Sequence, residues 1–252
     1  MPVPVFAAAG LLGLVVGSFL NVVAHRLPLR ASLVRPRSAC PQCAAPVRPY
    51  DNVPVLSWLL LRGRCRDCGT RISPRYPLVE AGTAALWLAV AAVHHADTTQ
   101  LVLGLVLVTF LVPLALIDLD HKILPNRITG PAALVGLGLG LALDPAGEPE
   151  RLLAAAIAGG SVGLIALLMP SGMGMGDAKL LGVLGLYLGA GVAPAVLVAL
   201  VSGTLVGVLI IARIGLSAGR KTAVPFGVFL ALGGVVAVLA GDPLLDWYLT
   251  LG

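Results

Sequence analysis

Two clusters of carboxylates lie beside long apolar segments in this chain. Asp118 and Asp120 follow an apolar run that ends at Ile117, and Asp177 follows a glycine-rich segment at residues 172–176. Ionisable groups at membrane depth are costly, so each is a functional candidate. Two facing carboxylates share one proton, because like charges a few ångströms apart cannot both ionise cheaply. The ionised partner then activates a water molecule while the protonated partner polarises a carbonyl group.

The residue types alone are also compatible with noncatalytic roles for these acids. Asp118 also fits a charge at the end of a helix, and Asp120 fits a solvated neighbour. The Gly-x-Gly-Asp pattern before Asp177 is weak evidence by itself, because it also fits an ordinary turn. Its glycines would let a backbone segment come close to a substrate strand. Asp118 and Asp177 are therefore the candidate catalytic residues, and Asp120 is the alternative to Asp118.

The composition indicates an all-α polytopic membrane protein. Of the 252 residues, 58% are hydrophobic and 12% are charged, and the mean hydropathy is +0.98. A soluble domain carries about 25% charged residues. Apolar runs of about 20 residues can cross a hydrocarbon core, and in lipid such runs must be helical. We expect about eight transmembrane helices, near residues 5–24, 79–94, 100–117, 130–143, 152–169, 179–192, 194–212 and 224–241.

The distribution of the basic residues among the loops indicates how the chain is oriented in the membrane. If residues 25–78 are cytoplasmic, all but Arg151 of the 17 Lys and Arg residues fall on the cytoplasmic side. The exterior side then keeps the acids Asp97, Asp144, Glu148 and Glu150, with a brief loop at 144–151. We therefore expect both termini outside and both carboxylate clusters at the cytoplasmic face. This distribution explains the net charge of +5 without a nucleic-acid partner.

All four cysteines lie in the one sizeable polar segment, between the first two predicted helices. Cys40-x2-Cys43 and Cys65-x2-Cys68 are separated by 21 residues, close to the spacing of a zinc ribbon. Two such turns can complete a tetrahedron of sulfurs, which leaves no open position on the metal. Nearby arginines favour the thiolate form. Disulfides or free thiols are the alternatives, and a cytoplasmic location argues against disulfides. We expect a structural Zn²⁺ in a small cytoplasmic, zinc-ribbon-like insertion.

Further motifs follow one another from about residue 10 to 215. Besides the cysteine pairs they are Gly17-Ser-Phe-Leu-Asn-Val-Val-Ala-His-Arg-Leu-Pro28, Tyr76-Pro77-x-x-Glu80, Ile117-Asp-x-Asp-His-x-Ile-Leu-Pro-Asn126 and Gly174-x-Gly-Asp-x-Lys-Leu-Leu181. In this order they resemble the motifs of bacterial type IV prepilin peptidases. These are the prepilin leader peptidase/N-methyltransferases of the GxGD-type intramembrane aspartic protease family.

The resemblance implies an intramembrane aspartic endopeptidase of the bacterial inner membrane. Such enzymes remove the short basic leader from type IV prepilins and pseudopilins at the cytoplasmic face. The family's catalytic aspartates carry over to Asp118 and Asp177. Asp118 is preferred to Asp120 because of the eight-residue step to Asn126, which related archaeal enzymes share. The resemblance also implies N-methylation of the new amino terminus by S-adenosylmethionine, although no recognisable cofactor loop is present.

The motifs also suggest a division of the chain by role. We expect residues 1–78 to hold the first helix and the four-cysteine zinc-binding segment, and residues 79–252 to form a seven-helix peptidase domain. Two other functional classes fit these residues less well. A proton-coupled transporter would require carboxylates nearer the middle of helices. A noncatalytic zinc-bearing assembly scaffold would leave the positions of Asp118 and Asp177 unexplained.

Overall fold

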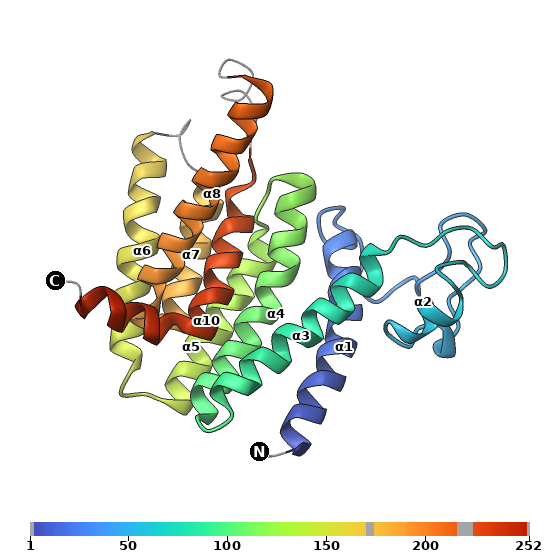
Figure 1. Cartoon of the computed structure of the whole chain (residues 1–252), viewed down its shortest axis with the longest axis horizontal. Helices are drawn as coiled ribbons and strands as arrows, with labels where there is room; N and C mark the ends of the chain where they lie inside the picture. The colour runs from blue at the N-terminus through green and yellow to red at the C-terminus, as the bar shows by residue number, and fades with distance from the viewer. Residues whose placement is uncertain (1–2, 170–173, 216–223, 251–252) are drawn as a thin grey trace. The chain divides into compact units, whose positions relative to one another are not determined.

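The computed structural model describes residues 3–169, 174–215 and 224–250, without the side chains of residues 242 and 246–249. Within these ranges the chain is helical apart from turns, loops and two isolated β-bridges, as the composition predicts. The chain forms two compact units, residues 1–95 and 96–252, which are described separately (Figure 1). Gly172 and Met173 of the glycine-rich segment lie outside the described residues, as do the basic residues Arg220 and Lys221.

The first unit pairs two long helices, α1 (Val3–Arg26) and α3 (Arg75–His94). Glycines of α1 face the backbone of α3. A Cβ at Gly13 would lie 2.7 Å from Ala84 Cα, and a Cβ at Gly17 would lie 2.8 Å from the α3 backbone. Membrane helices that pack this closely need small residues at their interface, because a side chain would clash with the opposing helix.

The insertion between these helices contains two short helical segments, η1 (Pro49–Asp51) and α2 (Leu56–Leu60). The indole N–H of Trp58 donates to the carbonyl of Ile72 at 3.1 Å, which ties α2 to the segment that leads into α3. The carboxylate of Glu80 in α3 accepts the N–H of Val55 at 2.7 Å. These bonds fix the polar insertion to the helix pair without a sizeable apolar core.

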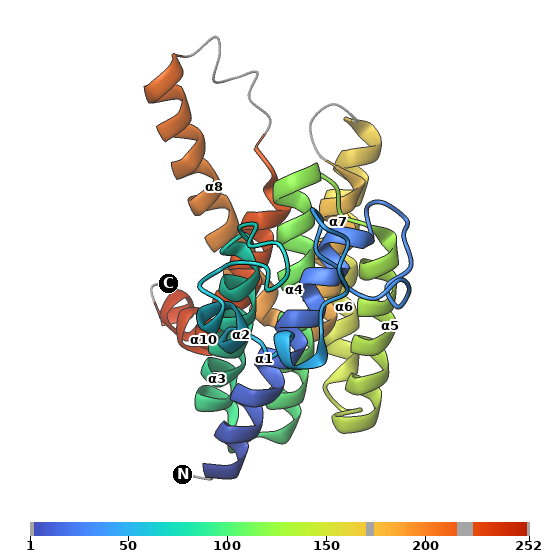
Figure 2. The ribbon, with the colours of Figure 1, turned by 90° about the vertical axis from the view of Figure 1, so that its right-hand side faces the viewer.

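The second unit is a helical bundle (Figure 2). Its elements are α4 (Thr98–His121), α5 (Asn126–Leu143), α6 (Glu148–Leu168), α7 (Met175–Leu188), η2 (Gly189–Gly191), α8 (Val192–Ile214) and α10 (Phe226–Thr250). Helix α6 packs on α7, α8 packs on α10, and α10 also packs on α4. Figure 2 shows α8 leaning away from its neighbours toward its carboxyl end.

An apolar stripe along α4 forms the interior of this bundle. Leu103, Leu107, Leu111, Leu114 and Ile117 are at most 1% exposed. Their spacing of three or four residues places them on one face of the helix. The stripe therefore runs along α4 and ends directly before the first candidate carboxylate.

Each of the eight predicted apolar ranges coincides with one helix, but several predicted ends are wrong. The third predicted helix continues beyond residue 117 to His121. The fourth begins at Asn126 instead of 130, and the sixth begins at Met175 instead of 179. Hydropathy detects only the apolar part of a helix, whereas backbone hydrogen bonding continues into its polar end turns. The candidate carboxylates consequently lie in terminal helical turns and not in loops.

Five helical segments in the described ranges are long and apolar enough to cross a membrane. They are Val3–Arg26, Arg75–His94, Thr98–His121, Glu148–Leu168 and Met175–Ile214, and Phe226–Gly241 is a shorter apolar helix. The segment Met175–Ile214 contains η2, so the division predicted at residues 189–194 is present. The polytopic membrane character is confirmed, and the number of crossings stays a prediction.

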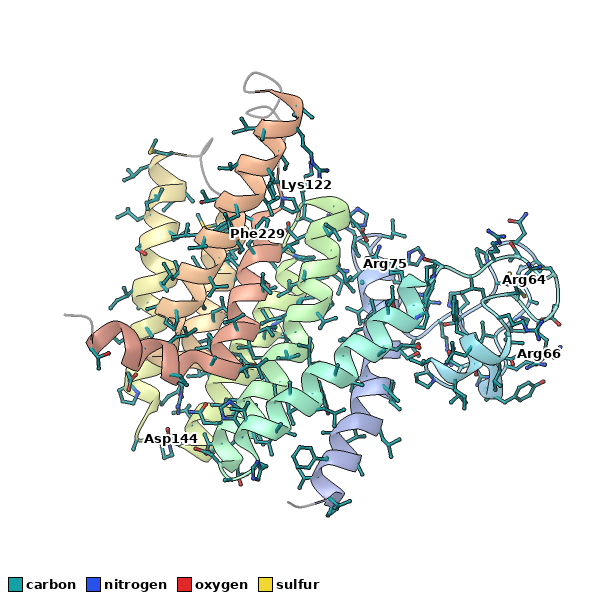
Figure 3. All side chains as sticks on the ribbon, in the orientation of Figure 1. Arg64, Arg66, Arg75, Lys122, Asp144 and Phe229 are labelled. Carbon is teal, nitrogen blue, oxygen red and sulfur yellow. The ribbon has the colours of Figure 1, made fainter. Side chains whose placement is uncertain are left out.

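Residues 144–151, expected to be an exterior loop, instead include the start of α6. Glu148 is 1% exposed and accepts the Nε–H of Arg151 at 3.0 Å. Arg151 also donates to Asp144 at 3.0 Å. Among the described residues, Glu148 Oε1 is buried without a hydrogen-bond partner, so Arg151 satisfies this carboxylate only through Oε2. The segment expected to be a brief loop is therefore partly helical and partly buried, and its exterior location stays a prediction. Figure 3 shows Asp144 at the end of this unit opposite Lys122.

The contact between α6 and α7 generates a prediction from two adjacent glycines. A Cβ at Gly159 would lie 2.9 Å from Gly182 Cα, whereas a Cβ at Gly160 would meet nothing within 4 Å. Gly159→Ala should therefore lower the unfolding temperature in detergent, at a cost of about 1–3 kcal/mol for overpacking. Gly160→Ala is the matched control and should be neutral or slightly stabilising. Equal effects of the two substitutions would contradict this packing of α6 on α7.

Candidate functional site

The last turn of α4 carries the first carboxylate cluster. Lys122 has a left-handed φ of 55°, and its N–H donates to the carbonyl of Asp118 at 2.8 Å. This C-cap ends the helix at His121. Pro125 then keeps the chain extended immediately before α5. Asp118 and Asp120 thus belong to one well-defined helical turn.

Asp118 and Asp120 differ in burial. Asp118 is 5% exposed, whereas Asp120 is exposed. Asp118 Oδ2 accepts the N–H of Val228 at 3.2 Å, and the N–H of Gly227 is also directed at this carboxylate. Both amides belong to the first turn of α10, where unpaired N–H groups favour a negative charge. This environment favours Asp118 as the functional carboxylate of the cluster.

Asp177 lies in the first turn of α7, not before the helix as the sequence suggested. Gly174 is the extended N-cap residue, and its carbonyl accepts the N–H of Asp177 at 3.0 Å. An acidic residue in the first turn interacts favourably with the helix dipole. Asp177 is partly buried at this position.

Two glycines allow these helix ends to meet around Leu124. A Cβ at Gly176 would lie 3.1 Å from Leu124 Cβ, and a Cβ at Gly227 would lie 2.9 Å from Leu124 Cδ2. Gly176 is the second glycine of the Gly-x-Gly-Asp pattern. The pattern therefore has a packing role, because it lets α7 approach the segment between α4 and α5. Its expected approach to a substrate strand stays a prediction.

The carboxylates of Asp118 and Asp177 lie close enough to repel each other. They come from α4 and α7, which contact directly. In general, two carboxyl groups within a few ångströms of each other can share one proton. Two such carboxyl groups have the chemistry to activate a water molecule and polarise a carbonyl group, and the catalytic role of Asp118 and Asp177 stays a prediction.

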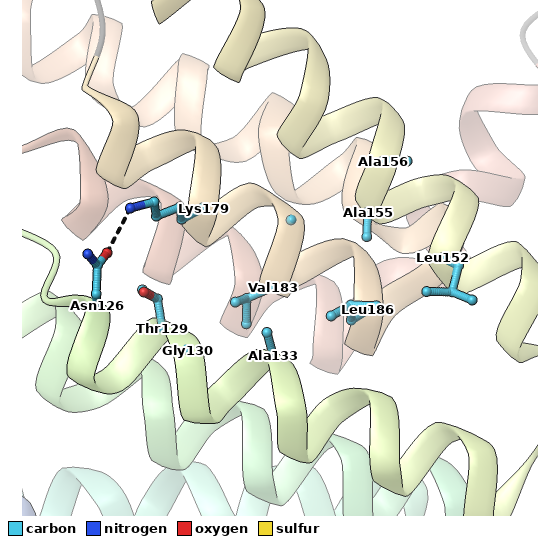
Figure 4. Close-up of a pocket in the computed structure, with 11 residues that line it drawn as sticks. Asn126, Thr129, Gly130, Ala133, Leu152, Ala155, Ala156, Lys179, Val183 and Leu186 are labelled. Carbon is cyan, nitrogen blue, oxygen red and sulfur yellow. Dashed lines mark hydrogen bonds between the residues drawn. The ribbon is translucent and has the colours of Figure 1, made fainter.

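A hydrogen bond joins two motif-bearing segments at this end of the bundle. Lys179 Nζ donates to Asn126 Oδ1 at 2.9 Å (Figure 4). Beside this bond, facing sides of α5, α6 and α7 line a groove of about 590 Å³. Residues two apart on a helix point in nearly opposite directions, so Lys179 and Asp177 lie on different sides of α7. The groove therefore lies away from the carboxylate pair.

The four cysteines come together in the first unit. Their sulfurs all lie within 4.8 Å of one another. The Sγ atoms of Cys40 and Cys68 are 3.8 Å apart, and those of Cys43 and Cys65 are 4.0 Å apart. Tetrahedral zinc with Zn–S bonds of about 2.3 Å requires sulfurs about 3.8 Å apart. The donor set and its spacing fit a four-coordinate zinc ion.

The two C-x2-C turns share one backbone geometry. The N–H of Cys40 donates to the carbonyl of Ala45 at 2.9 Å, and the N–H of Ala44 returns to the carbonyl of Cys40 at 2.9 Å. The turn at Cys65 repeats this pattern, with Gly69 in the place of Ala44. Ala44 and Gly69 both have a positive φ, of 58° and 71°. Each turn thus directs two sulfurs toward one point.

The backbone also prepares one of these thiols for metal binding. Hydrogen bonds from the backbone of Cys43 and Gln42 lower the pKa of Cys40 to about 6. Arg66, which lies between Cys65 and Cys68, instead pairs with Asp51 through Nε at 2.9 Å. The main contribution at Cys40 therefore comes from the backbone and not from an arginine side chain.

Comparison with known proteins places this chain among characterised sequences. The model of the Bacterial Peptidase A24 N-terminal domain matches residues 11–94, and the model of the Type IV leader peptidase family matches residues 105–212. The "Prepilin leader peptidase/N-methyltransferase" of Myxococcus xanthus is 43% identical over 87% of this chain and 67% of its own length. The protein of the same name from Pseudomonas putida is 42% identical over 93% of this chain and 90% of its own length. The chain belongs to the type IV leader peptidase family.

Membership of the type IV leader peptidase family confirms the resemblance drawn from the motifs. A third relative with the same name, from Pseudomonas aeruginosa, is 37% identical over 95% of this chain and 91% of its own length. The match to residues 11–94 falls within the first compact unit, and the match to residues 105–212 falls within the second. No solved structure matches this leader peptidase sequence.

The sequence analysis missed three contributors to the site of this leader peptidase. Leu124 lies between Gly176 and Gly227, and Gly227 and Val228 face Asp118 from α10. Leu124 lies inside the motif at residues 117–126, where the sequence pattern indicates no role for a leucine. In the sequence, Gly227 is only a glycine near the start of an apolar segment. Its proximity to Asp118, which the structure shows, indicates its role.

Proposed function

We propose that this chain is an intramembrane aspartic endopeptidase that removes the basic leader from type IV prepilins and pseudopilins. The observation that carries the proposal is the pair Asp118–Asp177, which two helix ends bring within electrostatic range in a member of the leader peptidase family. The relatives named above all carry the peptidase name, which does not favour the transporter or scaffold hypotheses.

In this mechanism the pair shares one proton before the substrate is cut. The ionised carboxylate takes a proton from water as the water attacks the scissile carbonyl, and the other carboxyl group donates a hydrogen bond to the carbonyl oxygen. When the tetrahedral intermediate collapses, a proton passes to the leaving amine. Asp118 and Asp177 carry both proton transfers, and Asp120 is an exposed neighbour.

We also propose that the chain methylates the amino terminus created by cleavage, as the names of its relatives suggest. S-adenosylmethionine would supply the methyl group. The sequence contains no recognisable loop for this cofactor, so we assign no residue to it.

Cys40, Cys43, Cys65 and Cys68 would hold a structural Zn²⁺, since four thiolates leave no position for substrate. Metal binding would then contribute directly to folding of the insertion. We assign the first helix and this insertion, residues 1–78, to one functional part and residues 79–252 to the peptidase domain.

The orientation proposed from the charges puts the carboxylate pair at the cytoplasmic face of the bacterial inner membrane. Both termini would then face the exterior. Prepilin and pseudopilin precursors are the proposed partners, with the lipid bilayer around the helices.

The carboxylate mechanism predicts the effect of isosteric amides. Asp118→Asn and Asp177→Asn should each reduce leader cleavage by at least about 10⁴-fold, because an amide can neither take a proton from water nor pass one on. Cleavage is measured with purified protein in detergent on a precursor that has a basic leader, a glycine before the cut and an apolar helix after it. Folding and membrane insertion should be unchanged.

Asp120→Asn is the matched control and should have a milder effect. Substantial turnover by Asp177→Asn would end the aspartic mechanism. Activity kept by Asp118→Asn but lost in Asp120→Asn would instead move the first carboxylate by two residues.

The cysteine cluster predicts one zinc ion per chain. Metal analysis of the purified protein should find about one equivalent, and Cys40→Ser should lose it because the tetrahedral site then lacks a ligand. Gln42→Ala, in the same turn, should keep the metal. Cysteines found oxidised in the native cell would refute the zinc site.

The charge distribution predicts the topology. Reporter fusions after residues 97 and 148 should report an exterior location, and fusions after residues 45 and 218 should report a cytoplasmic one. A reversed result at any two of these positions would overturn the orientation and the cytoplasmic placement of both aspartates.

A further inference from the structure

The first turn of α10 lies directly against the Asp118 carboxylate. Asp118 is 5% exposed, and its Oδ2 accepts the N–H of Val228 at 3.2 Å. The N–H of Gly227 is directed at the same carboxylate. The first N–H groups of a helix have no partner within the helix, so an acceptor placed there satisfies them. Asp118, more than one hundred residues earlier in the chain, supplies that acceptor.

The backbone of Gly227 approaches this carboxylate so closely that a Cβ atom at residue 227 would clash with it. A Cβ at Gly227 would lie 2.8 Å from Asp118 Oδ2 and 3.1 Å from Asp118 Cγ. It would also lie 2.9 Å from Leu124 Cδ2. Contacts this short force one of the groups to move. Leu124 has a flexible side chain, whereas the Asp118 carboxylate is fixed by its hydrogen bonds to the amides of α10.

We propose that Gly227 is a positioning residue that seats the Asp118 carboxylate against the amino terminus of α10 and thereby aims it at Asp177. This inference rests on the proposed peptidase function of the pair. The seat offers donors only, so Asp118 Oδ2 acts as an acceptor there, and a proton on Asp118 could sit only on Oδ1. Hydrogen bonds from a helix amino terminus favour the ionised form of a carboxylate over the same carboxylate without them. We therefore assign water activation to Asp118 and the shared proton to Asp177.

The first test is Gly227→Ala in the full-length protein. The added methyl group displaces Asp118 from its seat, so kcat/KM for leader cleavage should fall by about 100-fold, as small misplacements of catalytic groups do. The acid limb of the pH–rate profile should also move to higher pH, because Asp118 loses donors that favour its ionised form. Gly138→Ala is the control, since a Cβ there meets nothing within 4 Å. Its activity and pH profile should match the parent chain.

A double substitution separates the carboxylate from general packing. Leu124→Ala removes the other close contact of the new methyl group but leaves Asp118 in place. Gly227→Ala/Leu124→Ala should therefore stay impaired and keep the shifted pH profile. Recovery of activity in this double variant would make Gly227 a packing residue and overturn the proposal. Failure of both Gly227→Ala variants to fold would assign Gly227 to stability and would also overturn it.

A thermal unfolding cycle gives a readout that does not depend on catalysis. If the methyl group clashes with Asp118, Gly227→Ala should lower the unfolding temperature less in an Asp118→Ala background than in the parent chain. Equal shifts in both backgrounds would contradict the seat.

These results also separate this inference from the peptidase proposal. One outcome would refute the seat but leave the peptidase proposal standing. In that outcome Asp118→Asn and Asp177→Asn are inactive, whereas Gly227→Ala has the same activity and pH profile as the Gly138→Ala control. An active Asp118→Asn chain would refute the catalytic pair itself, whatever the unfolding cycle shows.

Discussion

The candidate site depends on how closely three helix ends approach one another. The end of α4 and the starts of α7 and α10 meet around Leu124, where Gly176 and Gly227 leave room that side chains would fill. This approach brings the α10 amides to Asp118. A buried carboxylate without such donors would be costly at membrane depth. Because the α10 amides reach Asp118 only if the helix ends pack closely, the packing also stabilises the charge of Asp118.

The two units hold the candidate carboxylates and the cysteine cluster on different kinds of scaffold. In the second unit, long apolar helices hold polar groups at their ends, where backbone N–H groups are available. In the first unit, the insertion has little apolar core and relies on hydrogen bonds, ion pairs and the cysteine cluster. A tetrahedral ion held by the four cysteines would constrain this small segment as burial of apolar side chains constrains the bundle.

Glycine serves two purposes in this leader peptidase. At Gly13, Gly17 and Gly159 it lets whole helices pack together, which membrane helices achieve through shape because lipid gives no hydrophobic drive between them. At Gly176 and Gly227 it instead opens space at helix ends for a motif residue and a carboxylate. The same residue type therefore supports stability in one place and the geometry of the site in another.

The sequence by itself determined the membrane class, the helix order, the cysteine cluster and both carboxylate segments, because apolar run length and ligand spacing are local properties. It misjudged the ends of α4, α5 and α7, since hydropathy does not report the polar turns in which Asp118, Asn126 and Asp177 lie. Only the tertiary structure distinguished Asp118 from Asp120 by burial and revealed Gly227 as its neighbour. Such contacts join residues far apart in the chain, and no local pattern encodes which helix end will lie against which carboxylate.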